Sequence, residues 1–514
     1  MKTPLVAIHM DMKYLMPKKS YLIEWVRRMP EWGVNAVLLE YEDKFPFEKY
    51  PFLRHAEAWT AAELKEFLAA ARGAGVRVIP LVQTLSHLEF ALAHPQLAQL
   101  REAADIETQI CPCKPEAVQF VHDLIDEIMS WHADEPLFHV GADEAWFLGT
   151  CPACAPKTDG GKNKAALWLP HTRDICNYVI AKGKRPIVWD DSFWHDPKLS
   201  SQLPKEVILG AWHYHLTRPE QCDKVLNPCL DAYRRNGQDA VTVPCCNWGV
   251  ILPGKHALAN TAMLAEVARK KETMGVINSA WTCFHTVWQG YEAYVAATGA
   301  AMKGVDVMAD SWREEYFAKE FGVTVDGLLP AFDALGAMWE IKVAGFGRPI
   351  SPIIYGYMDM VVHYKGGQLE RQKRGIYPLD WKEIDFNGLY RRKLEMIRAL
   401  PEAEKTAAFA KLDESLKSYA DAAVVMAKLR KSAKARKDVA LLFSATADLK
   451  LQAARALSLL LRGDQDAADV KRAYRACRKP LETALRGMYE DISVERMMAM
   501  WWAPTDAALK AVGK

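Results

Sequence analysis

The chain has 514 residues, of which 50% are hydrophobic, 25% charged and 10% aromatic, and its 66 Lys and Arg nearly balance its 64 Asp and Glu. These proportions are typical of globular proteins and exclude disordered, collagen-like and disulfide-scaffold classes. No apolar run approaches the roughly 18 to 20 residues that span a bilayer, so we expect a soluble protein without a membrane partner. The length predicts about two to four domains, or one large barrel with an appended domain.

The first apolar run, residues 4–8, is too short for the core of a signal peptide, and the sequence has no Asn-x-Ser/Thr glycosylation site. The eleven cysteines are too dilute for a disulfide scaffold, and their odd number leaves at least one free thiol. We therefore expect a cytoplasmic protein with reduced cysteines.

Short aliphatic or β-branched runs alternate with longer amphipathic stretches over the first 300 residues, which is typical of βα units around a parallel sheet. Eight such strands predict an α/β fold of the (β/α)8 or TIM barrel type, and an open doubly wound sheet is the weaker alternative. The predicted strands are Leu5–Met10, Asn35–Glu40, Val76–Val82, Leu137–Val140, Pro186–Trp189, Val207–Trp212, Ala240–Val243 and Val276–Ala280.

Helix signals lie between these strands. Thr60 and Glu63 have the spacing of a capping box, and Gly73-Ala74-Gly75 ends that helix before the third strand. Residues 116–132 form a second clear amphipathic pattern. Strand patterning ceases after about residue 303, and from Trp381 onward Ala, Leu, Lys, Arg and Glu recur at helical spacing. We predict a barrel domain over residues 1–325 and an all-helical C-terminal domain over residues 326–514.

The near-neutral total charge hides two halves of opposite sign. Residues 361–514 contain 30 Lys and Arg against 20 Asp and Glu, whereas residues 1–360 contain 36 against 44. A basic helical face attracts anionic glycans or nucleic acids, but no nucleic-acid-binding motif accompanies the charge. We expect no nucleic-acid partner, and favour a basic face that is solvated or packs on the acidic barrel.

The fourth predicted strand runs into the segment Phe138-His139-Val140-Gly141-Ala142-Asp143-Glu144. In a (β/α)8 barrel the carboxyl ends of the strands form the active face, so polar residues there are candidate catalytic groups. Alternation along the strand directs His139, Gly141 and Asp143 to one side, with Glu144 at the turn. Two adjacent carboxyls repel each other, so we expect one pKa to rise, as a proton donor near neutral pH requires.

This segment resembles the His-x-Gly-Gly/Ala-Asp-Glu signature of glycoside hydrolase family 20, the β-N-acetylhexosaminidases. The resemblance covers most of the barrel, is closest to the hexosaminidase D branch of the family, and does not extend to the helical C-terminal region. The other motifs that carry it are Tyr41-Glu42-Asp43-Lys44-Phe45-Pro46-Phe47, Ile79-Pro80-Leu81-Val82-Gln83-Thr84-Leu85-Ser86-His87-Leu88-Glu89-Phe90, Val188-Trp189-Asp190-Asp191 and the Trp281–Glu292 stretch.

The resemblance implies retaining hydrolysis that is assisted by the substrate. The 2-acetamido oxygen of the sugar attacks the anomeric carbon and forms an oxazolinium intermediate, so no enzyme nucleophile and no cofactor is needed. Glu144 would be the general acid and then the general base, while Asp143 would orient the acetamido N–H and stabilise its developing positive charge. The implied substrate is a glycan or glycoconjugate with a terminal β-linked N-acetylhexosamine.

Tryptophans at the predicted strand ends independently favour a sugar site. Trp189, Trp212, Trp248 and Trp281 lie at or just beyond the ends of the fifth to eighth strands. The C–H faces of sugars pack on indole rings, and each indole adds one hydrogen-bond donor. A single tryptophan is usually a core residue, but four at successive strand ends indicate a lined pocket. The resemblance supports Trp189, Trp212 and Trp281 most directly.

The resemblance also implies roles for several polar residues. Tyr214 matches a tyrosine that holds the acetamido oxygen, and Glu292 matches a carboxylate that binds sugar hydroxyls; a rim tyrosine and a helix-surface glutamate are the plainer alternatives. His87 and His139 resemble histidines that support the site, although a lone histidine is more often structural. Asp190 and Asp191 are predicted to be carboxylates at the rim of the site.

One departure from the family pattern concerns the first strand. Most family members have an arginine there that grips sugar hydroxyls, whereas this strand continues His9-Met10-Asp11-Met12-Lys13. The hexosaminidase D branch also has an Asp and a Lys in this place and is associated with GalNAc. We expect Asp11, Lys13 and Glu40 to replace the arginine, which puts a preference for GlcNAc in doubt.

Four cysteines are paired in two loops. Cys111-Pro112-Cys113 precedes the helix at 116–132, and Cys151-Pro152-Ala153-Cys154 follows the Asp143-Glu144 strand. Four thiolates at such spacing could hold a tetrahedral structural zinc, while free thiols and a redox disulfide remain alternatives. A zinc there would brace the loops and take no part in hydrolysis.

The sequence therefore favours an exo-acting β-N-acetylhexosaminidase that takes GalNAc first and GlcNAc second. A catalytically silent glycan-binding barrel is the alternative, and Asp143, Glu144 and Tyr214 argue against it. A third reading makes the basic helical region a partner-binding module with the barrel as its support. The oligomeric state is left open, a homo-oligomer included.

Overall fold

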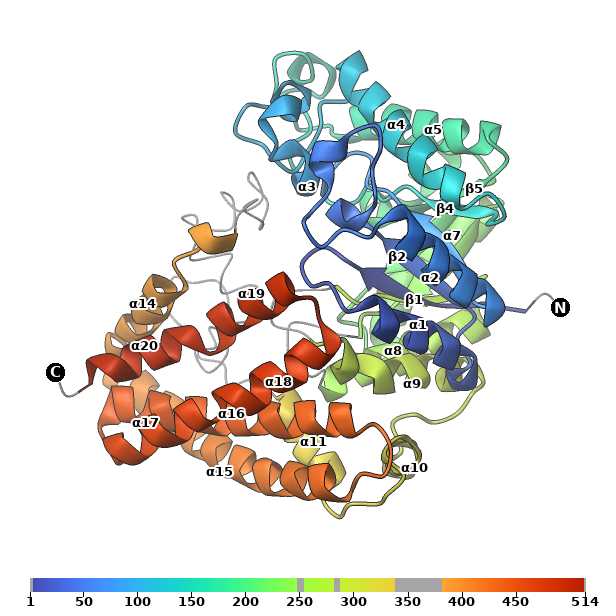
Figure 1. Cartoon of the computed structure of the whole chain (residues 1–514). Coiled ribbons are helices and arrows are strands. Elements are labelled where there is room, and N and C mark those ends of the chain that lie inside the picture. Colours follow the sequence, from blue (N-terminus) through green and yellow to red (C-terminus); the bar gives the residue numbers. More distant parts are fainter. Residues whose placement is uncertain (1–2, 247–253, 282–286, 338–380, 513–514) are drawn as a thin grey trace.

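The computed structural model describes residues 3–246, 254–281, 287–337 and 381–512. Its eight parallel strands close into a barrel in sequence order, with the first strand paired to the last (Figure 1). The predicted (β/α)8 barrel is confirmed. The strands are β1 Leu5–Asp11, β2 Ala36–Glu40, β3 Arg77–Leu81, β4 Leu137–His139, β5 Arg185–Trp189, β6 Ile208–Trp212, β7 Asp239–Val243 and β8 Gly275–Asn278.

Two apolar cores hold the barrel together. Side chains of the strands alternate between its two faces, so each strand supplies both cores. A small cluster made almost entirely of strand residues, among them Leu38, Ile79, Ile187 and Ile277, fills the interior. A much larger cluster joins the outward-facing strand residues to the surrounding helices and extends into the C-terminal helices.

Helices between the strands form the outer ring of the barrel. The predicted capping box is present, because Thr60 Oγ1 accepts a hydrogen bond from Glu63 N at 3.2 Å and Thr60 N donates to Glu63 Oε2 at 2.9 Å. The helices of this part are α1 Lys19–Arg28, α2 Ala61–Gly73, α3 Glu89–Leu92, α4 Pro115–Trp131, α5 Ala165–Ala181, α6 Pro219–Lys224, α7 Leu226–Arg235, α8 Lys255–Lys270 and α9 Glu292–Met302.

Beyond β8 the described residues form helices and no further strand, as the sequence predicts. The helices after α9 lie below the barrel and on one side of it, at the bottom and left of Figure 1, and α15 and α16 are the longest of them. They are α10 Asp310–Phe321, α11 Leu328–Gly336, α14 Phe386–Arg398, α15 Glu402–Ser432, α16 Lys437–Arg462, α17 Ala467–Ala476, α18 Arg478–Met488, α19 Asp491–Trp501 and α20 Ala503–Ala511.

The C-terminal helices pack on the loops that follow β1, β2 and β8. Ser493 Oγ accepts a hydrogen bond from Met16 N and donates one to Glu57 Oε2, both at 2.8 Å. The buried Arg496 donates to the carbonyl of Tyr14, and the hydroxyl of Tyr489 accepts from Trp288 N at 2.8 Å. These loops lie at the carboxyl ends of the strands, so the C-terminal helices lie beside the face where the predicted site is located.

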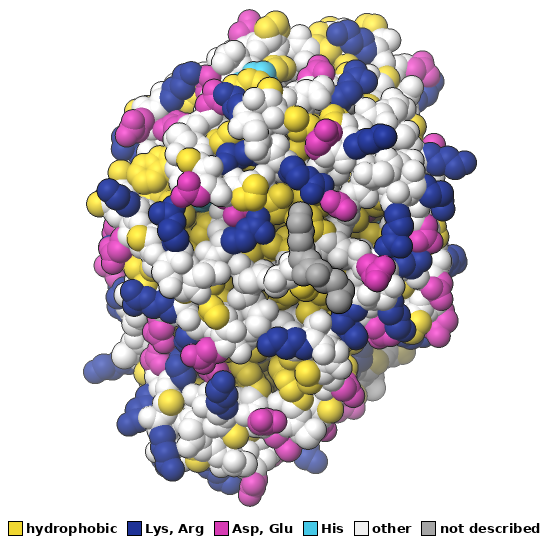
Figure 2. Space-filling view, turned by 90° about the vertical axis from the view of Figure 1, so that its right-hand side faces the viewer, with side chains coloured by type: hydrophobic (Ala, Val, Ile, Leu, Met, Phe, Trp, Pro, Cys, Tyr) yellow, Lys and Arg dark blue, Asp and Glu magenta, His cyan; other side chains and the backbone are white. Residues whose placement is uncertain are grey.

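Charged side chains of both signs are interspersed on the face turned to the right of Figure 1 (Figure 2). Several basic side chains of the C-terminal helices are paired with acidic ones, for example Arg462 with Asp413 at 2.7 Å and Arg455 with Asp469 at 2.6 Å. Across the described ranges, no helix is both long and apolar enough to cross a membrane.

Candidate active site

The backbone turns sharply between β4 and the two predicted catalytic carboxyls. β4 ends at His139, and Gly141, Ala142 and Glu144 have positive φ values of 61°, 73° and 50°. The prediction that strand alternation continues to Asp143 is therefore wrong, because the chain leaves the strand conformation after His139. Positive φ is costly for residues with a Cβ and is typical of strained functional sites. The strain directs the Asp143 and Glu144 side chains into their positions.

Gly141 is required at its position for two reasons. Its φ of +61° favours glycine, and a Cβ there would lie 2.0 Å from Gln83 Oε1. We expect Gly141→Ala to lower kcat/KM by about 10-fold or more, since the overlap must move either Gln83 or the Asp143 backbone. Gly160→Ala is the matched control, because Gly160 has φ +64° with no neighbour within 4 Å of the added Cβ. Equal activity of the two variants would contradict this prediction.

His87 lies between the two carboxyls. Its Nε2 is 3.5 Å from Asp143 Oδ2 and 3.4 Å from Glu144 Oε2. Burial lowers the pKa of His87, but the two carboxylates outweigh it and raise that pKa well above its usual value. The two contacts therefore favour the protonated form of the imidazole.

Asp143 and Glu144 differ in their exposure. Asp143 is 6% exposed, and its Oδ1 has no hydrogen-bond partner among the described residues, while the Glu144 side chain is 35% exposed. A buried oxygen without a donor suits an N–H group of a ligand, because an unpaired buried acceptor is costly. The more exposed Glu144 can meet both a leaving group and water.

The two carboxylates expected at the rim, Asp190 and Asp191, are placed differently. Asp190 is fully buried and accepts hydrogen bonds from Trp194 Nε1 at 2.9 Å and Tyr233 Oη at 3.0 Å, and more weakly from Trp212 N at 3.3 Å. It therefore positions neighbouring aromatic residues and does not lie at the rim, and burial raises its pKa to about 7.

Asp191 contacts the Asp143-Glu144 segment directly. Its Oδ2 accepts a hydrogen bond from the backbone N–H of Glu144 at 2.9 Å. Burial and then the charge of Asp143 raise the pKa of Asp191 well above its usual value. The carboxyl whose pKa rises is thus Asp191, which lies next to the pair, and the expected rise within the pair itself stays a prediction.

Aromatic side chains line one side of the site. Trp281 lies 6.3 Å from Trp189 between ring centroids, and its Nε1 donates to Tyr214 Oη at 2.9 Å. Tyr214 in turn lies 5.0 Å from Trp212, and His139 packs on Trp189 at 4.1 Å. The structure brings the predicted residues Trp189, Trp212, Tyr214 and Trp281 into one aromatic wall. Trp248 lies outside the described residues.

A buried polar cluster surrounds Lys13. The backbone N–H of Lys13 donates to Asp11 Oδ1 at 2.8 Å, and its Nζ lies 3.0 Å from Glu89 Oε1 and 3.4 Å from Glu42 Oε1. Glu40 accepts hydrogen bonds at 3.0 Å from His9 Nε2 and from Gln83 Nε2.

The pKa values of Asp11 and Glu40 in this cluster shift in opposite directions. Burial followed by the charge of Glu40 raises the pKa of Asp11 to about 7. Burial also opposes ionisation of Glu40, but the hydrogen bond and charge of His9 lower its pKa below the usual value. The cluster therefore offers both donors and acceptors at the ends of β1 and β2.

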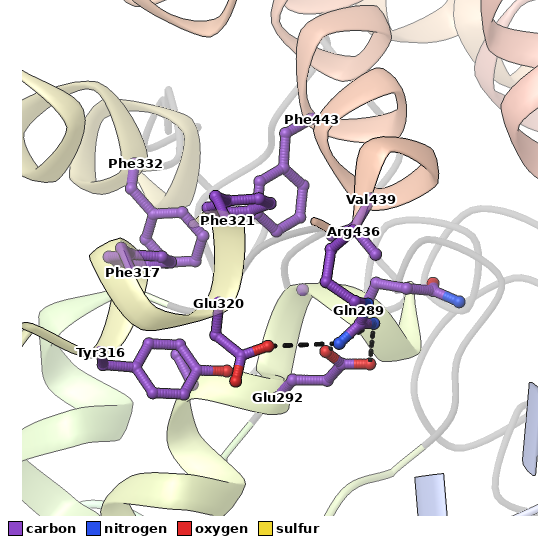
Figure 3. Close-up of a pocket in the computed structure, with 12 residues that line it drawn as sticks. Gln289, Glu292, Tyr316, Phe317, Glu320, Phe321, Phe332, Arg436, Val439 and Phe443 are labelled. Carbon is purple, nitrogen blue, oxygen red and sulfur yellow. Dashed lines mark hydrogen bonds and ion pairs between the residues drawn. The ribbon is translucent and has the colours of Figure 1, made fainter. Parts of the chain in front are cut away.

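Glu292 is not brought together with the catalytic pair. Its carboxylate is bound by Arg436 Nη2 at 2.9 Å and by the hydroxyl of Tyr21, and Arg28 Nη1 lies 3.6 Å away. Figure 3 shows Glu292 and Glu320 on either side of Arg436, in a pocket between the barrel and α16. The structure thus places this residue at the junction with the C-terminal helices and not beside Asp143 and Glu144.

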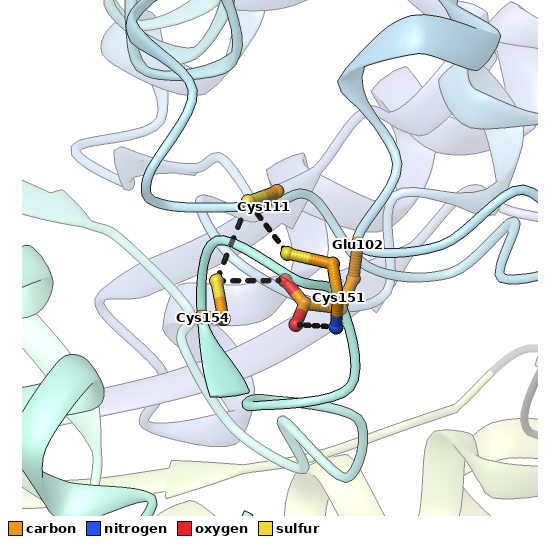
Figure 4. A group of neighbouring side chains, drawn as sticks. All are labelled: Glu102, Cys111, Cys151 and Cys154. Atoms are coloured by element: carbon orange, nitrogen blue, oxygen red, sulfur yellow. Dashed lines mark hydrogen bonds between the residues drawn. The ribbon is translucent and has the colours of Figure 1, made fainter. Parts of the chain in front are cut away.

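Three of the four paired cysteines come together. The Sγ atoms of Cys111, Cys151 and Cys154 lie in one buried group with the carboxylate of Glu102 (Figure 4). Cys113 is partly exposed, and its Sγ lies 3.3 Å from Lys157 Nζ.

Sequence reasoning assigned no role to Glu42, Gln83, Glu89 and Glu102. The first three lie within the quoted motifs, so their place in a shared segment is the signal that pointed to them. Glu102 lies outside every motif, and its three backbone hydrogen bonds to the loop after β4 have no signature in the sequence.

Comparison with known proteins agrees with this geometry. The family model described as glycosyl hydrolase family 20, catalytic domain, matches residues 40–286. Hexosaminidase D of Bos taurus is 36% identical over 290 residues, which cover 53% of this chain and 83% of that protein. The chain belongs to glycosyl hydrolase family 20. It is a glycoside hydrolase, and the resemblance seen in the sequence is confirmed.

Other relatives of this family 20 member are more distant. Hexosaminidase D of Homo sapiens is 31% identical over 315 residues, which cover 59% of this chain and 63% of that protein. The crystal structure of a β-N-acetylhexosaminidase from Bacteroides fragilis NCTC 9343 is 19% identical, with a TM-score of 0.47 over 58% of this chain and 65% of that one. The family assignment rests on the family model and the bovine relative.

Proposed function

We propose that this family 20 member is an exo-acting, retaining β-N-acetylhexosaminidase that removes terminal β-linked GalNAc or GlcNAc by substrate-assisted catalysis. The observation that carries the proposal is the group formed by Asp143, Glu144 and His87, which lies at the carboxyl end of β4 beside the aromatic wall. The two carboxyls are adjacent, as suits a reaction in which they need not flank the sugar from opposite faces.

In the first step the acetamido oxygen attacks the anomeric carbon while the bond to the leaving oxygen breaks. Glu144 donates its proton to that oxygen. Asp143 accepts a hydrogen bond from the acetamido N–H and balances the positive charge of the oxazolinium ion. In the second step Glu144 takes a proton from water, which attacks the anomeric carbon and opens the intermediate. The reaction uses the substrate, one water molecule and these side chains, and the proposal includes no cofactor.

The aromatic wall supports the placement of the sugar. Trp281 Nε1 donates to the phenol oxygen of Tyr214 and so fixes the hydroxyl that we assign to the acetamido oxygen. The indole N–H groups of Trp189 and Trp212 are buried, and no partner for them exists among the described residues. These donors suit sugar hydroxyls, because a buried N–H without an acceptor is costly.

We assign the remaining sugar hydroxyls to the cluster of Asp11, Lys13 and Glu40, and on this basis propose GalNAc as the preferred sugar and GlcNAc as the second. The cluster stands in place of the family arginine and offers a lysine with several carboxyl acceptors. We further propose a cytoplasmic site of action, because none of the ten described cysteines forms a disulfide and such thiols suit a reducing compartment.

The test compares hydrolysis of aryl β-GalNAc, aryl β-GlcNAc and aryl β-galactoside by the full chain. We expect turnover of both acetamido sugars, with the higher kcat/KM for GalNAc, and none of the galactoside, which lacks the attacking group. Cleavage of the galactoside at a similar rate would contradict substrate assistance. Binding of the acetamido sugars without turnover would favour a silent glycan-binding barrel instead.

A further inference from the structure

Two loops on the active face meet at the paired cysteines. Cys111 and Cys113 lie in the segment that connects β3 to α4 and includes α3, which we call the β3–α4 loop. Cys151 and Cys154 lie in the loop between β4 and α5. Cys111 Sγ is 3.5 Å from Cys151 Sγ and 3.4 Å from Cys154 Sγ (Figure 4). A disulfide bond is about 2.05 Å long, so none of these sulfur pairs is bonded.

The spacing of the sulfur atoms suits a common metal ion. With Zn–S bonds of about 2.3 Å in a tetrahedron, sulfur ligands lie about 3.8 Å apart. A disulfide bond joins two sulfur atoms, so a disulfide within this group of three thiols would leave the third thiol without a partner. Cys111 and Cys154 are fully buried and Cys151 is 5% exposed, so the group is closed to solvent on the inner side.

The backbone around Cys151 also favours binding of a metal ion by these thiols. Cys154 N and Ala155 N donate to the Cys151 carbonyl at 3.1 and 2.9 Å, which folds the CxxC segment into a tight turn with both thiols on one side. Glu102 Oε1 accepts from the N–H groups of Gly149, Thr150 and Cys151 at 3.0 to 3.1 Å and so ties this turn to the neighbouring loop.

Cys113 and Glu102 are the two candidates for the fourth ligand. Glu102 Oε2 lies 3.3 Å from Cys154 Sγ, but its other oxygen is already bound by three backbone donors. Cys113 is partly exposed, and its Sγ lies outside the compact group that the other three sulfur atoms form with Glu102. Lys157 Nζ at 3.3 Å supplies a positive charge next to it. A cation there offsets the negative charge of four thiolates around a divalent ion, and zinc favours sulfur ligands in closed structural sites.

We propose that Cys111, Cys113, Cys151 and Cys154 bind one Zn²⁺ ion that fastens the β3–α4 loop to the β4–α5 loop. The same two loops carry His87 and the Asp143-Glu144 pair. The zinc is a positioning element, because four protein ligands leave no open coordination site for substrate. It keeps the imidazole of His87 within reach of both carboxylates.

The first test is the metal content of the full chain, purified under reducing conditions without added chelator. We expect one zinc per chain, and loss of that zinc in Cys111→Ser and in Cys151→Ser. Cys222→Ala is the matched control, because Cys222 is buried in α6 away from the group and its variant keeps the metal. A zinc-free wild type, or a thiol count in denaturant that shows a disulfide among the four cysteines, overturns the proposal.

Cobalt substitution tests the ligand set, because the thiolate-to-cobalt absorption reports the number of sulfur ligands. We expect a four-thiolate spectrum that loses intensity in Cys113→Ser and stays unchanged in Glu102→Gln. The reverse result would make Glu102 the fourth ligand and overturn the four-cysteine site.

Removal of the metal tests the positioning role. We expect the midpoint of thermal unfolding to fall by about 5 °C or more, and kcat to fall with little change in the KM for the aryl sugar. Return of both properties with one equivalent of Zn²⁺ is part of the expected result, and unchanged kcat in the zinc-free protein overturns the positioning role. Zinc content is measured without substrate, so failure of the proposed hydrolysis leaves this test intact.

Discussion

Glu144→Gln is expected to lower kcat/KM for an aryl β-N-acetylhexosaminide by on the order of 10³-fold, because glutamine cannot donate the proton that the leaving oxygen needs. The loss depends on the leaving group. A phenol of low pKa departs without a proton, so a dinitrophenyl glycoside should lose far less than a methylumbelliferyl glycoside. This dependence identifies the residue as the general acid, and a plain loss of folding would not produce it.

The measurement is a series of aryl glycosides of increasing leaving-group pKa, assayed with wild type and variant. Glu116→Gln is a suitable control, since Glu116 is an exposed side chain in the first turn of α4. A similar loss for all leaving groups would speak against Glu144 as the acid. Added azide should speed the variant on the dinitrophenyl sugar, because azide attacks the intermediate without a general base.

Asp143→Asn is expected to lower kcat/KM by on the order of 10²-fold to 10³-fold for every leaving group alike. The reason is that Asp143 acts on the acetamido group and not on the leaving oxygen. Asparagine fills the same space but carries no charge for the oxazolinium ion, and its amide N–H₂ can face the acetamido N–H unfavourably. The same change should weaken binding of a thiazoline analogue of the intermediate by a similar factor.

The control for this variant is Asp159→Asn. Asp159 lies in the same loop with φ of 50° and an exposed side chain, and asparagine tolerates that backbone conformation. We expect the control to keep wild-type kcat/KM. If Asp143→Asn bound the thiazoline as tightly as wild type, its assigned role in holding the acetamido group would be refuted.

The barrel could be predicted from the sequence because its strands are local patterns. Each is a short run of β-branched and aliphatic residues, and β2, predicted over Asn35–Glu40, is found over Ala36–Glu40. The predicted helix at 116–132 is likewise found as α4, from Pro115 to Trp131. The capping box at Thr60 was equally readable, because both of its hydrogen bonds lie within four residues.

The sequence predicted which residues form the site better than it predicted their arrangement in space. Asp143 and Glu144 were found from their motif, but their turn depends on Gly141 lying against Gln83, a contact between the segments that follow β4 and β3. Glu292 shows the same limit more strongly. Its partner Arg436 follows it by 144 residues, and no local pattern indicates that such a pair will form.

The predicted location of Asp190, at the rim of the site, was wrong for a related reason. A carboxylate directly after a strand is typical of a rim position, yet Trp194 and Tyr233 donate to it and hold it inside. Burial of an acid follows from the donors that surround it in space, and these come from different elements.

The contact between Met16 N and Ser493 Oγ joins residues that are 477 positions apart. A ribosome that adds about 5–20 residues per second releases α19 at least about 20 seconds after the end of β1. During that interval the loops after β1, β2 and β8 lack the contacts with Tyr489, Ser493 and Arg496 that later fasten them. Until α19 is released, the apolar surface that the last helices bury stays exposed, and such surface promotes aggregation of unfinished chains.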